Sequence, residues 1–202
     1  ASSCPGSAGA FTGLAGKPGS DRGLAVDDSG NVYAVGSFTQ QHYNDSYDCD
    51  FDPGPGEGFA KVGATSQQAS GLVWKLDSSG NYQWAKAFLN TACPTCGGDY
   101  NSPLSVAVDG SGNVYTTGRF VGTIDFDPGA GTATMTAGTL NSGNWSGNSA
   151  FLSKLDSSGN YVWAKSISSA TGIGSPSMGI DSSGNCPTLN VTPGRLAFTD
   201  PV

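Results

Sequence analysis

The chain has little charge and few of the residues that build long helices. Only 12% of its 202 residues are charged, and Glu57 is the only glutamate. Long helices favour Glu, Lys, Leu and Ala, whereas short strands and tight turns tolerate a surface of Gly, Ser, Thr and Asn. The 31 glycines agree with many turns. The composition therefore predicts an all-β protein and argues against a helical one.

Membrane-spanning and nucleic-acid-binding proteins each need a feature that this sequence lacks. No apolar run approaches the roughly 20 residues of a transmembrane helix. The net charge is -7, and the nine Lys and Arg residues are dispersed rather than gathered into a basic patch. We therefore expect neither a membrane span nor a nucleic-acid partner. The acidity favours solubility and is compatible with metal cations.

Residues for catalysis are equally scarce. His42 is the single histidine, and no Gly-x-Ser-x-Gly elbow accompanies it. Paired carboxylates can hydrolyse glycosides, but one of them must stay protonated in an apolar pocket. Aspartates beside Pro-Gly turns are poor candidates for that role. The sequence therefore predicts a protein that is not an enzyme.

The chain does contain an internal repeat. Residues 23–36 return as 105–118, and residues 76–86 return as 155–165. Each segment contains Asp-x-Ser-Gly-Asn between two apolar stretches, which predicts a hairpin turn: Asp accepts hydrogen bonds from the amides ahead of it, and Gly supplies a positive φ. A fifth turn of this kind starts at Asp181 and opens a third, unfinished copy.

The repeat predicts strands at corresponding places in each copy. The expected strands are 23–27, 31–38, 72–76 and 82–88 in the first copy, 106–109, 114–120, 151–155 and 161–167 in the second, and 177–181, 188–191 and 195–199 in the third. Four antiparallel strands in tandem are the blade of a β-propeller, and closure needs at least about four blades. The predicted fold is all-β, with tandem four-stranded antiparallel propeller-blade-like units that are too few to close a propeller within one chain.

This pattern divides the chain into five segments. They are an N-terminal extension that could donate a strand (1–22), the first blade-like repeat (23–92), a Cys-containing linker (93–104), the second blade-like repeat (105–170), and a partial third repeat with a C-terminal extension (171–202).

Three motifs recur in the same order in both full copies. They read AVDxSGNVY, then DFDPG at 50–54 and 125–129, then KLDxSGNxxWAK. Over about residues 20–185, the chain resembles the β-propeller repeats of exported bacterial proteins. The resemblance implies a propeller-type β fold and an exported, bacterial protein. That family is defined by structure more than by activity, so it implies no catalytic residue.

Other features agree with an extracellular or cell-surface location. The chain begins at Ala1 without methionine, as a mature protein does after its signal peptide is removed. The Cys-Pro-Thr-Cys sequence favours a structural disulfide, with a redox pair or half a zinc site as alternatives. The candidate disulfide residues are Cys4, Cys49, Cys93, Cys96 and Cys186, and the candidate glycosylation sites are Asn44, Asn144 and Asn190.

The DFDPG motifs have two interpretations. Asp50 and Asp52, like Asp125 and Asp127, are two residues apart and would share one side of a strand, where their oxygens could bind Ca²⁺. The favoured interpretation is a turn that ends a strand while the phenylalanine between the aspartates packs into the core. No cofactor is certain, and calcium is the alternative.

Tryptophans also repeat. Trp84 and Trp163 occupy equivalent positions, and we expect them to be mostly buried between blades rather than exposed for stacking on a glycan. Trp145 lies in a polar loop outside the repeat and is the better candidate for a surface contact.

The incomplete third copy suggests how the protein works. The N-terminal segment with Phe11 and Leu14 occupies the position of a fourth strand, and the third copy, with Leu189 and Val191, lacks one. We expect one subunit to complete the next by adding a strand, head-to-tail, which gives a filament or fibre. The predicted function is a non-enzymatic extracellular structural subunit. The alternative is a propeller-type binding module for a glycan or protein, as part of a larger exported protein.

Overall fold

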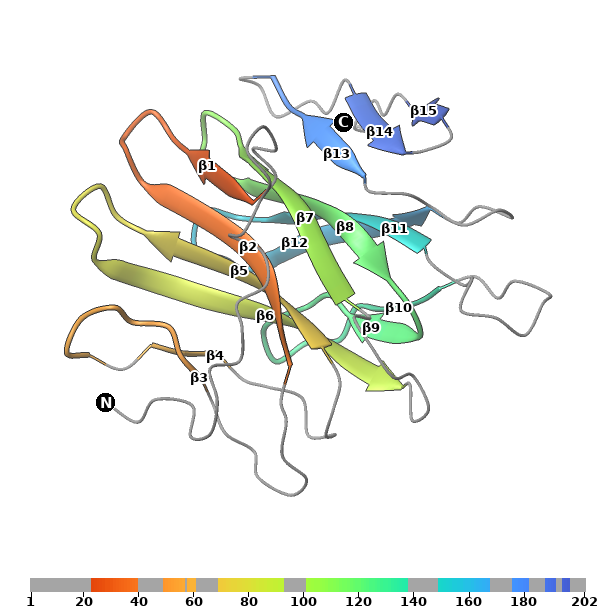
Figure 1. Ribbon diagram of the computed structural model, residues 1–202, viewed down its shortest axis with the longest axis horizontal. Helices are drawn as coiled ribbons and strands as arrows, with labels where there is room; N and C mark the ends of the chain where they lie inside the picture. The colour runs from red at the N-terminus through yellow and green to blue at the C-terminus, as the bar shows by residue number, and fades with distance from the viewer. Residues whose placement is uncertain are drawn as a thin grey trace.

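The computed structural model of the protein describes residues 23–39, 49–56, 58–60, 69–92, 101–137, 149–167, 176–181, 188–191 and 194–196. Every regular element among them is a β-strand, and all strand pairs are antiparallel (Figure 1). The all-β prediction is confirmed. The sheets do not close into a propeller or a barrel. No helix capable of crossing a lipid bilayer is found in these ranges.

Both predicted blade-like units are present, and each runs through its four strands in chain order. The first unit contains β1 (Leu24–Val26), β2 (Val32–Thr39), β5 (Ala69–Leu76) and β6 (Tyr82–Ala92). The second contains β7 (Asn101–Val108), β8 (Val114–Phe120), β11 (Ser149–Leu155) and β12 (Tyr161–Ile167). β7 begins at Asn101, inside the range expected to be a linker, and β6 continues four residues beyond its expected end.

The Asp-x-Ser-Gly-Asn turns are confirmed in the four places where the structure describes the whole motif. In each, the glycine amide donates to the carbonyl of the aspartate at 2.9 Å. The glycines have φ between 79° and 83°, a range that side chains disfavour, so glycine is needed there. These residues are Gly30, Gly80, Gly112 and Gly159.

Four short strands inside the insertions were not predicted. They are β3 (Cys49–Asp50) and β4 (Phe59–Ala60) in the first unit, and β9 (Thr123–Asp125) and β10 (Thr134–Thr136) in the second. β9 pairs with β6 of the other unit, which explains the extra length of β6. The first sheet therefore has six strands in the order β1-β2-β5-β6-β9-β10, and two of them come from the second repeat.

Each unit has two sides, because alternate residues of a strand point to opposite sides. We call face A the side that carries Leu24 and Val26 in the first unit and Val106 and Val108 in the second. Face B is the opposite side, which carries Tyr33 and Tyr115.

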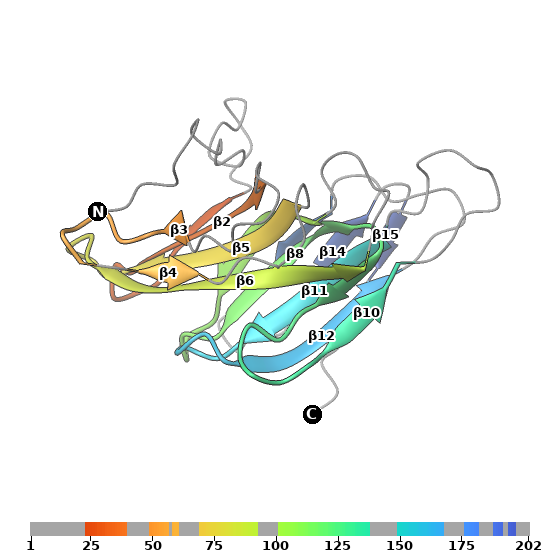
Figure 2. The ribbon, with the colours of Figure 1, turned by 90° about the horizontal axis from the view of Figure 1, so that it is seen from below.

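The units stack face B of the first on face A of the second (Figure 2). One buried cluster joins them. It contains Tyr33, Val35, Val73 and Phe88 from the first unit, and Val106, Val114, Phe120, Phe151 and Leu155 from the second.

Phe126 of the second DFDPG motif lies in the centre of this cluster. It is fully buried, and its ring centroid is 4.9 Å from that of Phe151, 5.3 Å from Phe88 and 5.6 Å from Phe120. The prediction that the motif phenylalanine packs into the core is confirmed here.

The equivalent residue in the first unit lies in a different place. Phe51 packs on face A of the first unit, beside the small cluster of Leu72, Ala85 and Ala87. The backbone of Gly58 approaches the ring of Tyr82 so closely that an added Cβ would lie 2.6 Å from the ring. The β3–β4 hairpin thus covers the β5–β6 part of face A with the phenylalanine only partly buried.

A third sheet follows the second unit. It contains β13 (Ser177–Gly179), β14 (Thr188–Val191) and β15 (Gly194–Leu196), in that order, and β13 lies against β7 (Figure 1). Strands lie at all three predicted places of the third copy, but β13 ends at Gly179 rather than at residue 181, and residues 197–199 lie outside the described part of the chain. Among the described residues this sheet has three strands.

Candidate functional site

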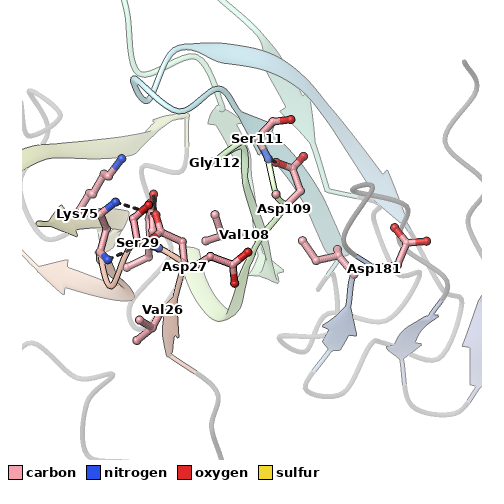
Figure 3. Close-up of a pocket in the computed structure, with 14 residues that line it drawn as sticks. Val26, Asp27, Ser29, Lys75, Val108, Asp109, Ser111, Gly112 and Asp181 are labelled. Atoms are coloured by element: carbon pink, nitrogen blue, oxygen red, sulfur yellow. Dashed lines mark hydrogen bonds between the residues drawn. The ribbon is translucent and has the colours of Figure 1, made fainter. Parts of the chain in front are cut away.

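A cleft of about 400 Å³ opens where the ends of the first strands of the three repeats converge (Figure 3). Equivalent residues of successive repeats line it. Each repeat contributes an apolar residue followed by an aspartate: Val26 and Asp27, Val108 and Asp109, and Ile180 and Asp181. The stacking of the units therefore gathers three equivalent aspartates at one end of the molecule.

The carboxylates of Asp27 and Asp109 accept hydrogen bonds from residues of their own hairpins. One oxygen of Asp27 accepts hydrogen bonds from the amides of Ser29 and Asn31, both at 2.9 Å. The other accepts from Asn31 Nδ2 at 2.8 Å and from the hydroxyl of Tyr33 at 3.0 Å. Asp109 repeats this arrangement with Ser111, Asn113 and Tyr115.

These hydrogen bonds keep both carboxylates charged. Burial opposes ionisation of Asp27 and Asp109, but hydrogen bonds from the asparagine, serine and tyrosine of each turn outweigh it and lower the pKa of both groups. Burial raises the pKa of the Tyr33 phenol, and the hydrogen bond to Asp27 and the charge of Asp27 raise it further. Carboxylates that stay charged and a phenol that stays protonated suit a structural role better than proton transfer at neutral pH.

The same lowered pKa values predict acid sensitivity. Asp27, Asp77, Asp109 and Asp156 all have a pKa below the ordinary 3.8. As pH falls, the unfolded chain takes up these protons first, so the free energy of unfolding should decrease below about pH 4 and change little above it. Urea unfolding midpoints between pH 2 and 7 measure this.

The matched control is Asp109→Asn, which removes one of the four groups. Its midpoint should fall less steeply between pH 4 and 2 than that of the unaltered protein. A midpoint that is flat or rises on acidification would contradict the assignment of these turns as stabilising anions.

Beside the cleft, a turn of the second unit contacts the first. Trp84 Nε1 donates to the carbonyl of Ser157 at 3.3 Å, and its ring lies edge-on to Tyr33 at 6.3 Å. Lys75 Nζ donates to the same carbonyl at 3.4 Å and lies 5.1 Å from the centre of the Tyr33 ring.

Trp84 therefore lies between the units, as predicted, but only partly buried, and Trp163 is likewise partly buried. Trp163 repeats the contact with a tyrosine, edge-on to Tyr115 at 6.3 Å. Trp84 thus lies at the edge of the interface between the units, whereas the contact of Trp163 is within the second unit.

The aspartates of the DFDPG motifs cap turns. Asp125 accepts from the amides of Asp127 and Ala133 at 3.1 and 2.8 Å. Asp127 accepts from Gly129, and Asp52 from Gly54, each at 2.7 Å. The side chain of Asp50 lies outside the described residues. Within the described ranges no group of three or more metal-binding side chains comes together. Calcium at these pairs stays a prediction.

Several candidate residues lie outside the part of the chain that the structure describes. These are the candidate disulfide residues Cys4, Cys93, Cys96 and Cys186, the candidate glycosylation sites Asn44 and Asn144, the loop residues His42 and Trp145, and the assembly residues Phe11 and Leu14. For Cys49, Leu189, Asn190 and Val191 the strands are described but the side chains are not. The disulfide, glycosylation and strand-donation assignments stay predictions.

The chain matches no family model. No curated protein matches it significantly either.

The convergence of the three aspartates does not follow from the turn motif alone, because each motif specifies only its own hairpin. A signal was present, because the aspartate occupies the same position in all three repeats, and repeats that stack in register bring equivalent positions together.

Proposed function

We propose that the protein is a non-enzymatic extracellular structural subunit that polymerises head-to-tail into a filament. The observation that carries this proposal is the open stack. The first unit, the second unit and the third sheet follow one another without closing. The third sheet has three strands among the described residues, whereas each unit has four consecutive strands of its own repeat. Such a stack can continue from one molecule to the next in the way that it continues within one molecule.

The proposed joint uses strand addition. The N-terminal segment, residues 1–22, supplies the fourth strand to the third sheet of the next subunit. Added strands contribute main-chain hydrogen bonds and cover a sheet edge that would otherwise pair without specificity. Oxidised cysteines and glycosylated sequons would fit the extracellular location that the repeat motifs imply.

The chemistry of the cleft supports a structural role over an enzymatic one. The carboxylates of Asp27 and Asp109 are held by turn amides, and the described lining contains neither histidine nor cysteine. No single observation favours a glycan or protein ligand over self-association, so the binding-module alternative is an outcome of the test below.

Deletion of residues 1–16 tests strand donation. We expect the unaltered chain to form species of many subunits by light scattering and fibres by negative-stain microscopy, and the shortened chain to stay monomeric. A synthetic peptide of residues 1–16 should bind to the shortened chain. Assembly that persists unchanged after the deletion would overturn strand donation, and an unaltered chain that is monomeric at high concentration would favour the binding module.

A further inference from the structure

Face A of the first unit is left uncovered at its β1 side. Leu24 is 49% exposed and Val26 is 59% exposed, which is unusual for large apolar side chains in neighbouring positions of one strand. The equivalent residues of the second unit are covered, since Val106 is 6% exposed and Val108 packs against the main core. All four positions carry apolar residues, so the difference in exposure comes from what packs against each strand.

The residues around Leu24 and Val26 continue the apolar surface across the sheet. Strand pairing places Leu24 in one row with Ala34, Trp74 and Ala85. The second row runs from Val26 through Val32 and Leu76 to Tyr82. Neither row contains a charged residue.

The molecule itself indicates what covers such a face. In the second unit, face A is covered by face B of the unit before it, through the core around Phe88 and Phe151. In the third sheet, Met178 and Ile180 stand at the positions of Leu24 and Val26 and are partly buried, with β13 against β7. The first strands of successive repeats are thus neighbours at both joints within one chain, β1 with β7 and β7 with β13.

The opposite end of the stack offers an open face B. Gly179 of β13 stands at the position of Ala25, which packs against the main core on face B of the first unit. Gly179 is exposed, and an added Cβ there would meet no atom within 4 Å. Among the described residues, one molecule therefore has open surface on face A at β1 of the first unit and on face B at Gly179 of the third sheet.

We propose that face A of the first unit packs on face B of the β13–β14–β15 sheet of a second copy, in the way that successive units pack within one chain. This rests on the proposed head-to-tail assembly and identifies the surface that carries it. The contact is heterologous, because different surfaces meet, so it gives a filament unless the rotation between copies closes a ring. A strand donated by residues 1–22 would enter the same sheet beside this contact.

Substitutions at each end of the joint test the proposal. Leu24→Asp with Val26→Asp places charge on face A, and Gly179→Arg places a bulky cation on face B. All three positions are exposed or open, so each variant should fold with a thermal midpoint close to that of the unaltered protein. Val162→Asp is the matched control, because Val162 is also an exposed apolar residue, at 46%. It lies in β12 of the second unit, which takes no part in the proposed contact.

Light scattering should find the Leu24/Val26 variant and the Gly179 variant monomeric, each with at least a tenfold lower assembled mass than the unaltered chain and the Val162 control. An equimolar mixture of the two defective variants should give a dimer and nothing larger, because each retains one working face. A mixture that stays monomeric, or that forms long assemblies, would overturn the head-to-tail pairing of these two faces.

The outcomes distinguish a failure of this contact from a failure of the proposed function. If the unaltered chain assembles and both variants assemble equally well, the joint is wrong while polymerisation stands. If the unaltered chain does not assemble at all, both are wrong. If the Leu24/Val26 variant keeps its mass but melts at a much lower temperature, face A is covered within one molecule, and the joint is overturned.

Discussion

Phe126→Ala should lower the free energy of unfolding by about 3–5 kcal/mol, the usual cost of removing a fully buried phenylalanine. The phenylalanine joins the two sheets, since it contacts Phe88 of the first unit and Phe120 and Phe151 of the second. Alanine would leave a cavity among rings that belong to different sheets and cannot easily close it. Urea unfolding of both proteins at one pH measures the loss.

The repeat supplies the matched control. Phe51 occupies the same position of the DFDPG motif but is only partly buried, on face A of the first unit. Phe51→Ala should therefore cost about 1–2 kcal/mol, because less apolar area is removed from contact. Equal losses for the two variants would mean that the sequence motif, rather than its place in the stack, sets the energy.

Gly118→Ala should destabilise the protein by about 2–3 kcal/mol, although alanine is ordinarily better than glycine inside a strand. A Cβ at this position would lie 2.1 Å from the carbonyl oxygen of Ser102 and 2.7 Å from the Cα of Pro103. Both are backbone atoms of the neighbouring strand, at an irregularity in its pairing, so β7 would have to move away.

Gly179→Ala serves as the comparison. It is also a strand glycine, but an added Cβ meets nothing within 4 Å. Its free energy of unfolding should stay within about 0.5 kcal/mol of the unaltered value. A neutral Gly118→Ala would show that β7 and β8 separate freely at this point, contrary to the close approach of their backbones.

The two hairpins of each repeat could be predicted because their information is local. Asp27 and Gly30 specify a turn whatever the surroundings, and the alternation that follows Val32 specifies a strand. The pairing of β9 with β6 could not be predicted in this way. Thr123 and Leu89 belong to different repeats, and nothing near either residue in the sequence indicates that their strands meet.

In the candidate site, too, local contacts could be predicted from the sequence and contacts between repeats could not. The sequence predicted that Asp27 and Asp109 would hold turns, because the donors lie within six residues of each. It did not predict that Phe126 and Phe51, in identical motifs, would have such different burial. That difference depends on which unit has a neighbour on face A, which is a property of the stack and not of the motif.

The six-stranded sheet has a consequence for how the chain folds. Because β9 and β10 belong to the second repeat but complete the sheet of the first, the edge of β6 beyond Phe88 lacks its β9 partner until residue 125 has been synthesised. Ordinary repeat arrays can fray one repeat at a time, since each repeat contains its own strands or helices. Here the repeats are interlocked, and we expect residues 23–167 to unfold in a single cooperative transition rather than in two. A break between the repeats would split a sheet instead of separating two modules.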